Sequence, residues 1–141
     1  TKPPVAISRR ALGGEAPIVI NEITDNCLYA GFFGILDSSR MKKVTDAILG
    51  IVDKSENDLM IVDLSNVEII DSTIANHLKK LNQLLLFVGI EVIFCGIKAV
   101  VAQSMIAAGV QLENMTIEKN LKRALKLVFK RQGFKLVKIE D

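Results

Sequence analysis

The fold of this chain is decided by residues 59–72, which read Leu59-Met60-Ile61-Val62-Asp63-Leu64-Ser65-Asn66-Val67-Glu68-Ile69-Ile70-Asp71-Ser72. The first six residues form a nearly continuous apolar run, which is typical of a central strand buried on both faces of a sheet. A loop is expected over residues 65–70, and Asp71-Ser72 then begins a predicted helix that runs to about Val88. Its core stripe, at helical spacing, is formed by Ile74, Leu78, Leu81, Leu85 and Val88.

The flanking segments continue this alternation of strand and helix. We expect strands over residues 17–23, 27–33 and 90–95, helices over residues 37–54, 98–108 and 119–131, an extended stretch over residues 110–117, and either a final strand or a loose tail over residues 134–139. The turn signal Asp25-Asn26 predicts a hairpin between the first two strands. Strands that alternate with helices predict parallel strands joined by right-handed crossovers.

The length of 141 residues fits one domain, and half of the residues are apolar, which is enough for a packed core. Residues 1–16 contain prolines, glycines and two arginines and are predicted to be a tail or linker. The domain proper is predicted over residues 17–131, followed by a C-terminal tail or extra strand over residues 132–141. If a larger part of the natural protein lies upstream, it joins at this tail.

Composition also points to a compartment. Residues 1–4 lack the apolar segment of a signal peptide, and the richest apolar window, residues 84–95, contains Glu91 and falls short of the ~20 residues of a spanning helix. The two cysteines, Cys27 and Cys95, do not form a CxxC pair, which fits a reducing environment. We therefore expect a cytoplasmic protein with no membrane partner.

The sequence lacks the residues that several classes of chemistry require. There is one histidine, His77, and no GxxxxGK[ST] or GxGxxG motif occurs, so we expect no metal, no cofactor and no enzymatic activity. Asp63 and Asp71 lie near the carboxyl end of a predicted strand, where α/β proteins place their sites, but acids at such positions commonly cap helices or form turns. Together with Asp37, they leave open the alternative that a small ligand binds in a groove near these three carboxylates.

A basic stretch near the C-terminus leaves two interpretations open. Eight lysines and arginines lie between Lys119 and Lys138 with no intervening acid. They suit RNA, an acidic lipid or an acidic protein face, or they form the solvated side of an amphipathic helix. A net charge of +2 and the absence of tryptophan argue against nucleic acid as the main partner.

The start of the helix after residue 70 carries the most specific signal. Asp71 or Ser72 can simply cap this helix, and the residues alone favour that interpretation. Alternatively, a phosphate on Ser72 would face the free backbone N–H groups of the first turn while being repelled by Asp71. It would add ~1.5–2 negative charges and switch off a binding face.

The quoted stretch resembles the central motif of STAS domains, the fold of anti-sigma factor antagonists, and Ser72 falls on the Ser/Thr that is phosphorylated in that family. Residues 75–78, 89–93 and 96–104 resemble the stressosome branch in order and spacing, and residues 34–37 resemble its Gly-x-x-Asp before the first helix, with Asp37 matching. The resemblance covers about residues 17–129. It implies an α/β STAS fold with a mixed sheet of about four to five strands and about four helices packed mainly on one face.

The resemblance also implies a mechanism. The unmodified domain binds a protein serine/threonine switch kinase of the GHKL type or an anti-sigma factor, and phosphorylation of Ser72 releases that partner. Ser104 falls on a second phosphoacceptor. Related STAS proteins are implied as further partners in a homo- or hetero-oligomer. Residues expected to contact the partner are Asp37, Asp71, Thr73, Asn76, His77 and Lys80. The alternative is a STAS module that binds a small ligand, a nucleotide or a lipid.

Overall fold

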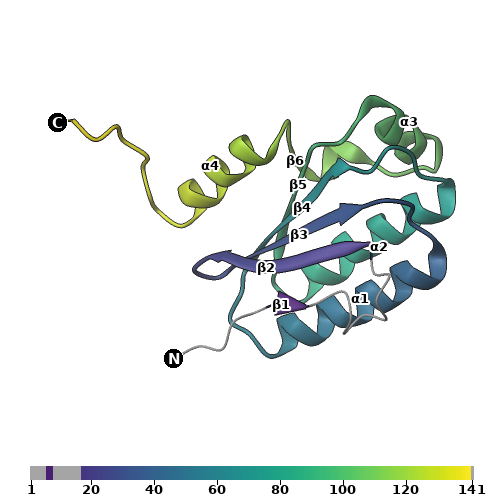
Figure 1. Ribbon diagram of the computed structural model, residues 1–141, viewed down its shortest axis with the longest axis horizontal. Helices are drawn as coiled ribbons and strands as arrows, with labels where there is room; N and C mark the ends of the chain where they lie inside the picture. The colour runs from purple at the N-terminus through teal and green to yellow at the C-terminus, as the bar shows by residue number, and fades with distance from the viewer. Residues whose placement is uncertain (1–5, 8–16, 141) are drawn as a thin grey trace.

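A computed structural model of the chain describes residues 6–7 and 17–140. Within these residues a sheet of six strands is flanked by four α-helices and one short 3-10 helix (Figure 1). The strands are β1 (Ala6–Ile7), β2 (Ile18–Thr24), β3 (Cys27–Phe33), β4 (Leu59–Asn66), β5 (Glu91–Cys95) and β6 (Thr116–Glu118). The helices are α1 (Ser38–Asp53), α2 (Ser72–Phe87), α3 (Ala99–Ala107) and α4 (Leu121–Arg131), and the 3-10 helix η1 spans Leu112–Asn114.

The six strands lie in the sheet in sequence order, and the pairing is mixed. β1, β2 and β3 pair antiparallel, and Asn26 in the β2–β3 turn adopts the left-handed backbone conformation (φ 62°) that hairpin turns require. β3, β4, β5 and β6 pair parallel, and a helix crosses between β3 and β4 and between β4 and β5. The predicted α/β class, with a hairpin leading into parallel strands, is therefore confirmed.

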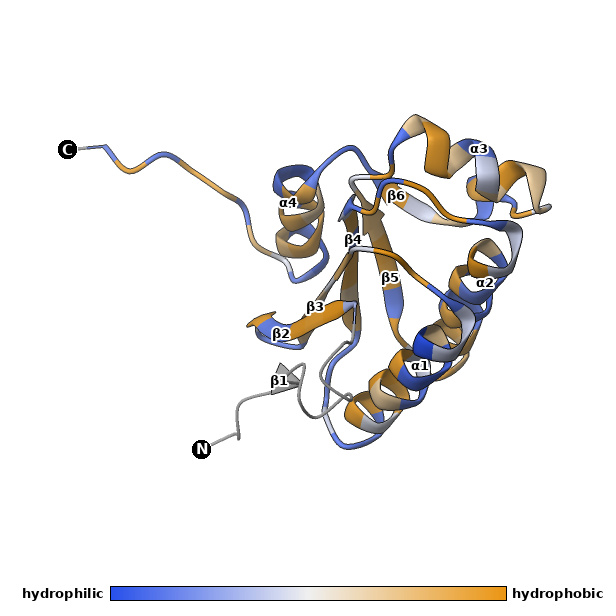
Figure 2. Ribbon diagram, turned by 45° about the vertical axis from the view of Figure 1, so that its right-hand side comes forward, coloured by the Kyte–Doolittle hydropathy of each residue, from blue (hydrophilic) through white to orange (hydrophobic). Residues whose placement is uncertain are grey.

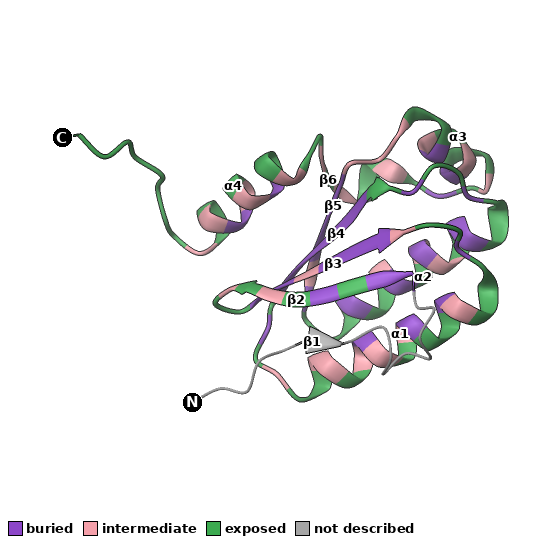
Figure 3. Cartoon of the chain, viewed as in Figure 1, coloured by how far each residue is buried: buried purple, intermediate pink, exposed green. Residues whose placement is uncertain are grey.

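The helices are divided unequally between the two faces of the sheet. α1, α2 and α3 share one apolar core with the sheet, whereas α4 packs on the opposite face (Figure 2). Burial is highest along β3, β4 and β5 (Figure 3). These strands are apolar on both faces because each face is covered by helices.

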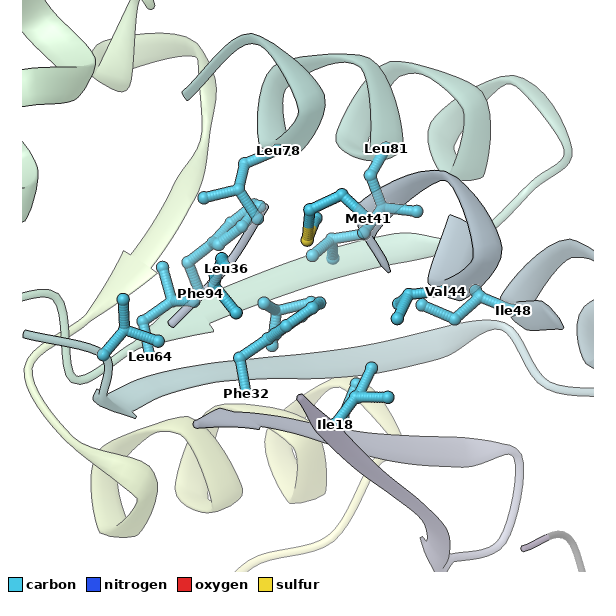
Figure 4. Close-up of a cluster of buried hydrophobic side chains, with 14 of the residues drawn as sticks. Ile18, Phe32, Leu36, Met41, Val44, Ile48, Leu64, Leu78, Leu81 and Phe94 are labelled. Atoms are coloured by element: carbon cyan, nitrogen blue, oxygen red, sulfur yellow. The ribbon is translucent and has the colours of Figure 1, made fainter. Parts of the chain in front are cut away.

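The larger core lies between the sheet and α1 and α2, where Phe32 and Phe94 from the strands meet Met41 and Leu78 from the helices (Figure 4). The smaller core lies beneath α4, and its buried residues are Cys27, Leu59, Ile61, Ile93, Cys95, Ala124 and Val128. Three helices on one face and one on the other agree with the expected packing mainly on one face.

Three local expectations are corrected, and one open alternative is settled. A two-residue strand, β1, lies inside the predicted N-terminal tail and adds a strand to the expected four to five, while residues 1–5 and 8–16 of that tail lie outside the described residues. β4 continues to Asn66 through the first part of the predicted loop because Asn66 still pairs with Phe33. The expected extended stretch over residues 110–117 contains the 3-10 helix η1, and the strand in this region, β6, spans only Thr116–Glu118. Residues 134–140 form no strand and are exposed, so the loose-tail alternative is correct there.

Candidate functional site

The candidate site lies where the parallel strands end. Because β3, β4 and β5 run in the same direction, the helices that follow them, α1, α2 and α3, all begin at one edge of the sheet, which we call the carboxyl edge. The opposite edge, where β4 and β5 begin, is called the amino edge. Every predicted contact residue except Lys80 lies within the first two turns of α1 or α2 or caps one of them.

At the start of α2, the capping residue and the residue with a free hydroxyl are two different residues. Asp71 is the N-cap, and its Oδ1 accepts a hydrogen bond from the backbone N–H of Ile74 at 2.9 Å. Ser72 is the first residue of the helix and is exposed, and its hydroxyl has no hydrogen-bond partner among the described residues. The cap interpretation is thus confirmed for Asp71, which leaves the Ser72 hydroxyl unused by the fold.

One side of α2 presents the other predicted residues. Thr73, Asn76 and Lys80 are exposed and His77 is half-buried, while Ile74 and Ala75 face the core. Because Ser72, Asn76 and Lys80 follow one another at four-residue spacing, they form one row along the helix surface.

α1 begins in a similar way, with more contacts to its capping residue. Asp37 Oδ1 accepts hydrogen bonds from the Arg40 backbone N–H and the Ser39 hydroxyl, both at 2.9 Å, and Asp37 Oδ2 lies 3.3 Å from Arg40 Nε. The Arg40 amide and the Ser39 hydroxyl hold the pKa of Asp37 below its ordinary value. Asp37 is exposed, as a contact residue must be.

Two exposed apolar residues next to these caps were not predicted. Ile35 is 82% exposed in the loop before α1, and Ile69 is 68% exposed in the loop before α2. Each lies two residues before a capping aspartate. The signal available in the sequence was weak, because a lone apolar residue in a loop is common; only the structure shows that both side chains point away from the core.

Asp63 does not join this surface. It is 7% exposed, and it accepts hydrogen bonds from Tyr29 Oη at 2.7 Å and from the Ser65 backbone N–H at 2.9 Å. Tyr29 packs on the α4 side of the sheet, so Asp63 lies on the face opposite to α1 and α2. Burial raises the pKa of Asp63, but the hydrogen bonds from Ser65 and Tyr29 outweigh it and hold the pKa below its ordinary value.

Asp63 also stabilises the loop that leads to α2, because its Oδ1 accepts the hydrogen bond from the Ser65 backbone N–H. Burial, with the charge of Asp63 beside it, raises the pKa of the Cys95 thiol to about 12, so this cysteine stays protonated at neutral pH. On the other side of the loop, Lys98 Nζ bonds Glu68 Oε1 and links the approach to α2 with the approach to α3. The loop before α2 is therefore held at two points, by Asp63 in β4 and by Lys98 after β5.

Ser104 has a different environment from Ser72. It is half-buried in the second turn of α3, and its hydroxyl donates to the Val100 carbonyl at 3.2 Å. The structure places it inside a helix rather than at a helix start.

Three hollows on the described surface are lined by residues other than Asp37, Asp63 and Asp71. Among residues 6–7 and 17–140, no group of three or more His, Cys, Asp or Glu side chains is placed to hold a metal ion. None of the helices in this part of the chain is long and apolar enough to cross a membrane.

Comparison with known proteins identifies the fold and the family. RsbRA of Bacillus subtilis (strain 168), an "RsbT co-antagonist protein", is 21% identical over 127 residues, which cover 90% of this chain and 46% of RsbRA. RsbRB of the same organism is 30% identical over 92 residues, covering 65% of this chain and 33% of RsbRB, so the chain spans less than half the length of these relatives.

A solved structure described as the molecular architecture of the stressosome, "a signal integration and transduction hub", superposes with a TM-score of 0.73 at 22% identity. The match covers 82% of this chain and 99% of that chain, and it shows the shared fold. The family model of the STAS domain matches residues 19–124, from β2 into α4, and the chain therefore belongs to the STAS domain family.

Proposed function

We propose that this chain is a non-enzymatic signalling module that binds a protein partner at the start of α2 and releases it when Ser72 is phosphorylated. The single observation that carries this proposal is the exposed Ser72 hydroxyl, which has no partner in the described part of the chain while Asp71 caps the helix in its place. A kinase can therefore modify Ser72 without breaking a contact of the fold.

The proposed contact surface combines an apolar and a polar part. Ile35 and Ile69 supply exposed apolar side chains, and Asn76, His77 and Lys80 supply polar ones along α2. Asp37, Asp71 and Thr73 complete the surface at the two helix starts. Burying a phosphate beside the Asp71 carboxylate would place two like charges in the interface, which costs binding energy in proportion to desolvation.

The proposed partner is a serine/threonine switch kinase or an anti-sigma factor. The relatives support this choice because their names describe co-antagonists of RsbT, and the stressosome chain supports assembly with related STAS proteins in a homo- or hetero-oligomer. In this proposal the module works in the cytoplasm. Ser104 is a second phosphoacceptor, and its modification requires the bond to Val100 to open first.

The test uses a GHKL-type switch kinase with ATP, and Ser38 supplies a matched control because it is the first residue of α1 after the Asp37 cap. Ser72→Ala should bind the kinase as the wild type does but accept no phosphate at this position, measured by intact mass and peptide mapping. Ser72→Asp should weaken binding by roughly a hundredfold in calorimetry, since it introduces an unpaired charge into the interface.

Ser38→Ala should be phosphorylated at Ser72 and bound like the wild type. Undiminished phosphate incorporation in Ser72→Ala, or equal affinity of Ser72→Asp and the wild type, would contradict the proposal.

A further inference from the structure

Charge is strongly segregated along this chain. Eight of the 18 lysines and arginines, and none of the 16 acids, lie in residues 119–138, so this segment carries +8 and the rest of the chain, with ten cations against 16 acids, carries −6. The eight cations form what we call the basic surface: Lys119, Lys122, Arg123, Lys126, Lys130, Arg131, Lys135 and Lys138. All eight are exposed.

Little of this charge is neutralised by the fold. Among the described residues, one carboxylate pairs with the basic surface: Glu91 lies 3.0 Å from Arg131 through Oε1 and Nε. The inner side of α4 is occupied by Ala124 and Val128, which are buried against the sheet, so its cations face outward.

The end of α4 is fixed in place. The Gln132 side-chain amide donates to Thr24 Oγ1 at 2.8 Å, and the backbone N–H of Phe134 donates to the Phe129 carbonyl at 2.8 Å, closing the helix at Gly133 (φ 85°). The segment that follows therefore leaves from a defined point at the amino edge, next to the β2–β3 turn.

That segment adds exposed apolar residues to the positive charge. Residues 134–139 read Phe134-Lys135-Leu136-Val137-Lys138-Ile139, and the four apolar side chains are between 60% and 90% exposed. Phe134 touches the chain through an edge-to-face ring contact with Phe129, with centroids 6.2 Å apart. Cations interleaved with exposed apolar residues are the composition of segments that lie in the headgroup region of a bilayer.

We propose that the basic surface and residues 134–139 together bind an anionic lipid membrane surface. The cations are attracted to the negative headgroups, and Phe134, Leu136 and Ile139 insert at the boundary with the acyl chains. The aliphatic side chains distinguish this partner from nucleic acid, because leucine, valine and isoleucine offer no stacking surface to a base. This departs from the expectation that no membrane takes part, because the sequence alone did not show that the segment after α4 is left uncovered.

The geometry leaves the α2 site accessible on a membrane. α4 covers the face opposite to α1 and α2 (Figure 2), and residues 134–139 leave at the amino edge, whereas Ser72 lies at the carboxyl edge. A chain bound through the basic surface would therefore present Ser72 away from the lipid. The inference does not depend on the phosphorylation of Ser72.

The test is flotation of the purified chain with vesicles of pure phosphatidylcholine or of phosphatidylcholine mixed with phosphatidylglycerol. We expect binding to the mixed vesicles alone, weakened by added salt. Replacing Lys122, Lys126 and Lys130 by Gln should reduce the partition coefficient by about a hundredfold, at roughly fivefold per lysine. The matched control replaces Lys42, Lys43 and Lys54, exposed lysines of α1 and its cap, and should retain wild-type binding.

A second variant avoids any question of folding, because residues 136 and 139 lie outside every helix and strand. Leu136→Ser with Ile139→Ser should reduce the partition coefficient about tenfold while the charge is unchanged. The proposal is overturned if mixed vesicles do not bind the chain, if the control triple loses as much as the α4 triple, or if the apolar double variant binds like the wild type. It is also overturned if the chain binds RNA or DNA more tightly than the vesicles and the Leu136→Ser, Ile139→Ser variant binds that nucleic acid as tightly as the wild type.

Discussion

The starts of α1 and α2 have the same sequence pattern and the same local structure. Ile35-Leu36-Asp37-Ser38 precedes α1, and Ile69-Ile70-Asp71-Ser72 precedes α2. In both, the isoleucine in the first position is exposed, the next residue is buried, the aspartate caps the helix by accepting the N–H three residues on, and the serine is exposed. The two starts follow neighbouring parallel strands, so they differ mainly in what surrounds them.

The difference lies in how each start is stabilised. The Asp37 carboxylate is bound by two neighbouring residues, Ser39 and Arg40. Arg40 also places a positive charge near Ser38. The Asp71 carboxylate has no cation within ion-pair distance in the described part of the chain, and its loop is held from outside by Asp63 and Lys98. A phosphate would therefore be partly neutralised at Ser38 and repelled at Ser72, which is why Ser72 suits a release switch.

The largest effect is expected from filling the space beneath the α2 loop. Gly96 has φ +70°, and a Cβ there would lie 2.9 Å from the Ser65 backbone nitrogen and would collide with the Ser65 hydroxyl. Gly34, before α1, has φ +74° with open space around it. Gly96→Ala should lower the free energy of unfolding by about 3 kcal/mol, as the sum of left-handed strain and a steric clash, measured by urea denaturation.

Gly34→Ala is the matched control for the strain alone and should cost about 1 kcal/mol. Equal losses in the two variants would mean that the α2 loop is no more tightly supported than the α1 loop.

A smaller effect is expected from removing the α2 cap. Asp71→Ala should lower the free energy of unfolding by about 1 kcal/mol because the Ile74 N–H loses its acceptor. Asp71→Asn should stay within a few tenths of a kcal/mol of the wild type, since asparagine caps equally well without the charge. Asp71→Asn should also bind the partner better than the wild type once Ser72 is phosphorylated; no gain in calorimetry would show that the carboxylate does not take part in release.

The comparison also shows how far the sequence could predict the structure. The buried run at residues 59–64 and the helical spacing after it predicted β4 and α2, because burial on both faces and amphipathic periodicity are local patterns. β1 was missed because a two-residue strand has no periodicity and depends on pairing with Ile20 and Asn21. The shift of the last strand to Thr116–Glu118 likewise depends on its partners in β5.

The candidate site was predicted in part for the same reason. The aspartate caps of α1 and α2 could be anticipated because capping is local. The direction of Asp63, away from Asp37 and Asp71, could not, because it is decided by Tyr29 and Ser65 around it. The exposure of Ile35 and Ile69 also depends on packing that no single stretch of sequence contains.

A still smaller effect is expected from the ion pair that supports the α2 loop. The Glu68 side chain is 82% exposed and the Lys98 side chain is 36% exposed, so water and salt screen their attraction. A double-mutant cycle of Glu68→Gln and Lys98→Met should give a coupling energy of about 0.5 kcal/mol that decreases at high salt. The i,i+3 pair of Asp37 and Arg40 offers the comparison within α1; a coupling of several kcal/mol at Glu68–Lys98 would contradict the screened geometry.

The smallest effect is the pH dependence of the α1 start. The pKa of Asp37 is lowered by the Arg40 amide and the Ser39 hydroxyl, so the unfolded chain binds this proton more tightly than the folded chain. Its contribution to stability is therefore present above the ordinary pKa of 3.8 and is lost as the pH falls through the lower folded value. Asp37→Asn keeps a capping side chain but cannot titrate, so its melting temperature should fall less steeply than that of the wild type between about pH 5 and about pH 2. If Asp37→Asn and the wild type lose melting temperature equally steeply over this range, the contacts of Asp37 with Arg40 and Ser39 do not contribute to acid stability.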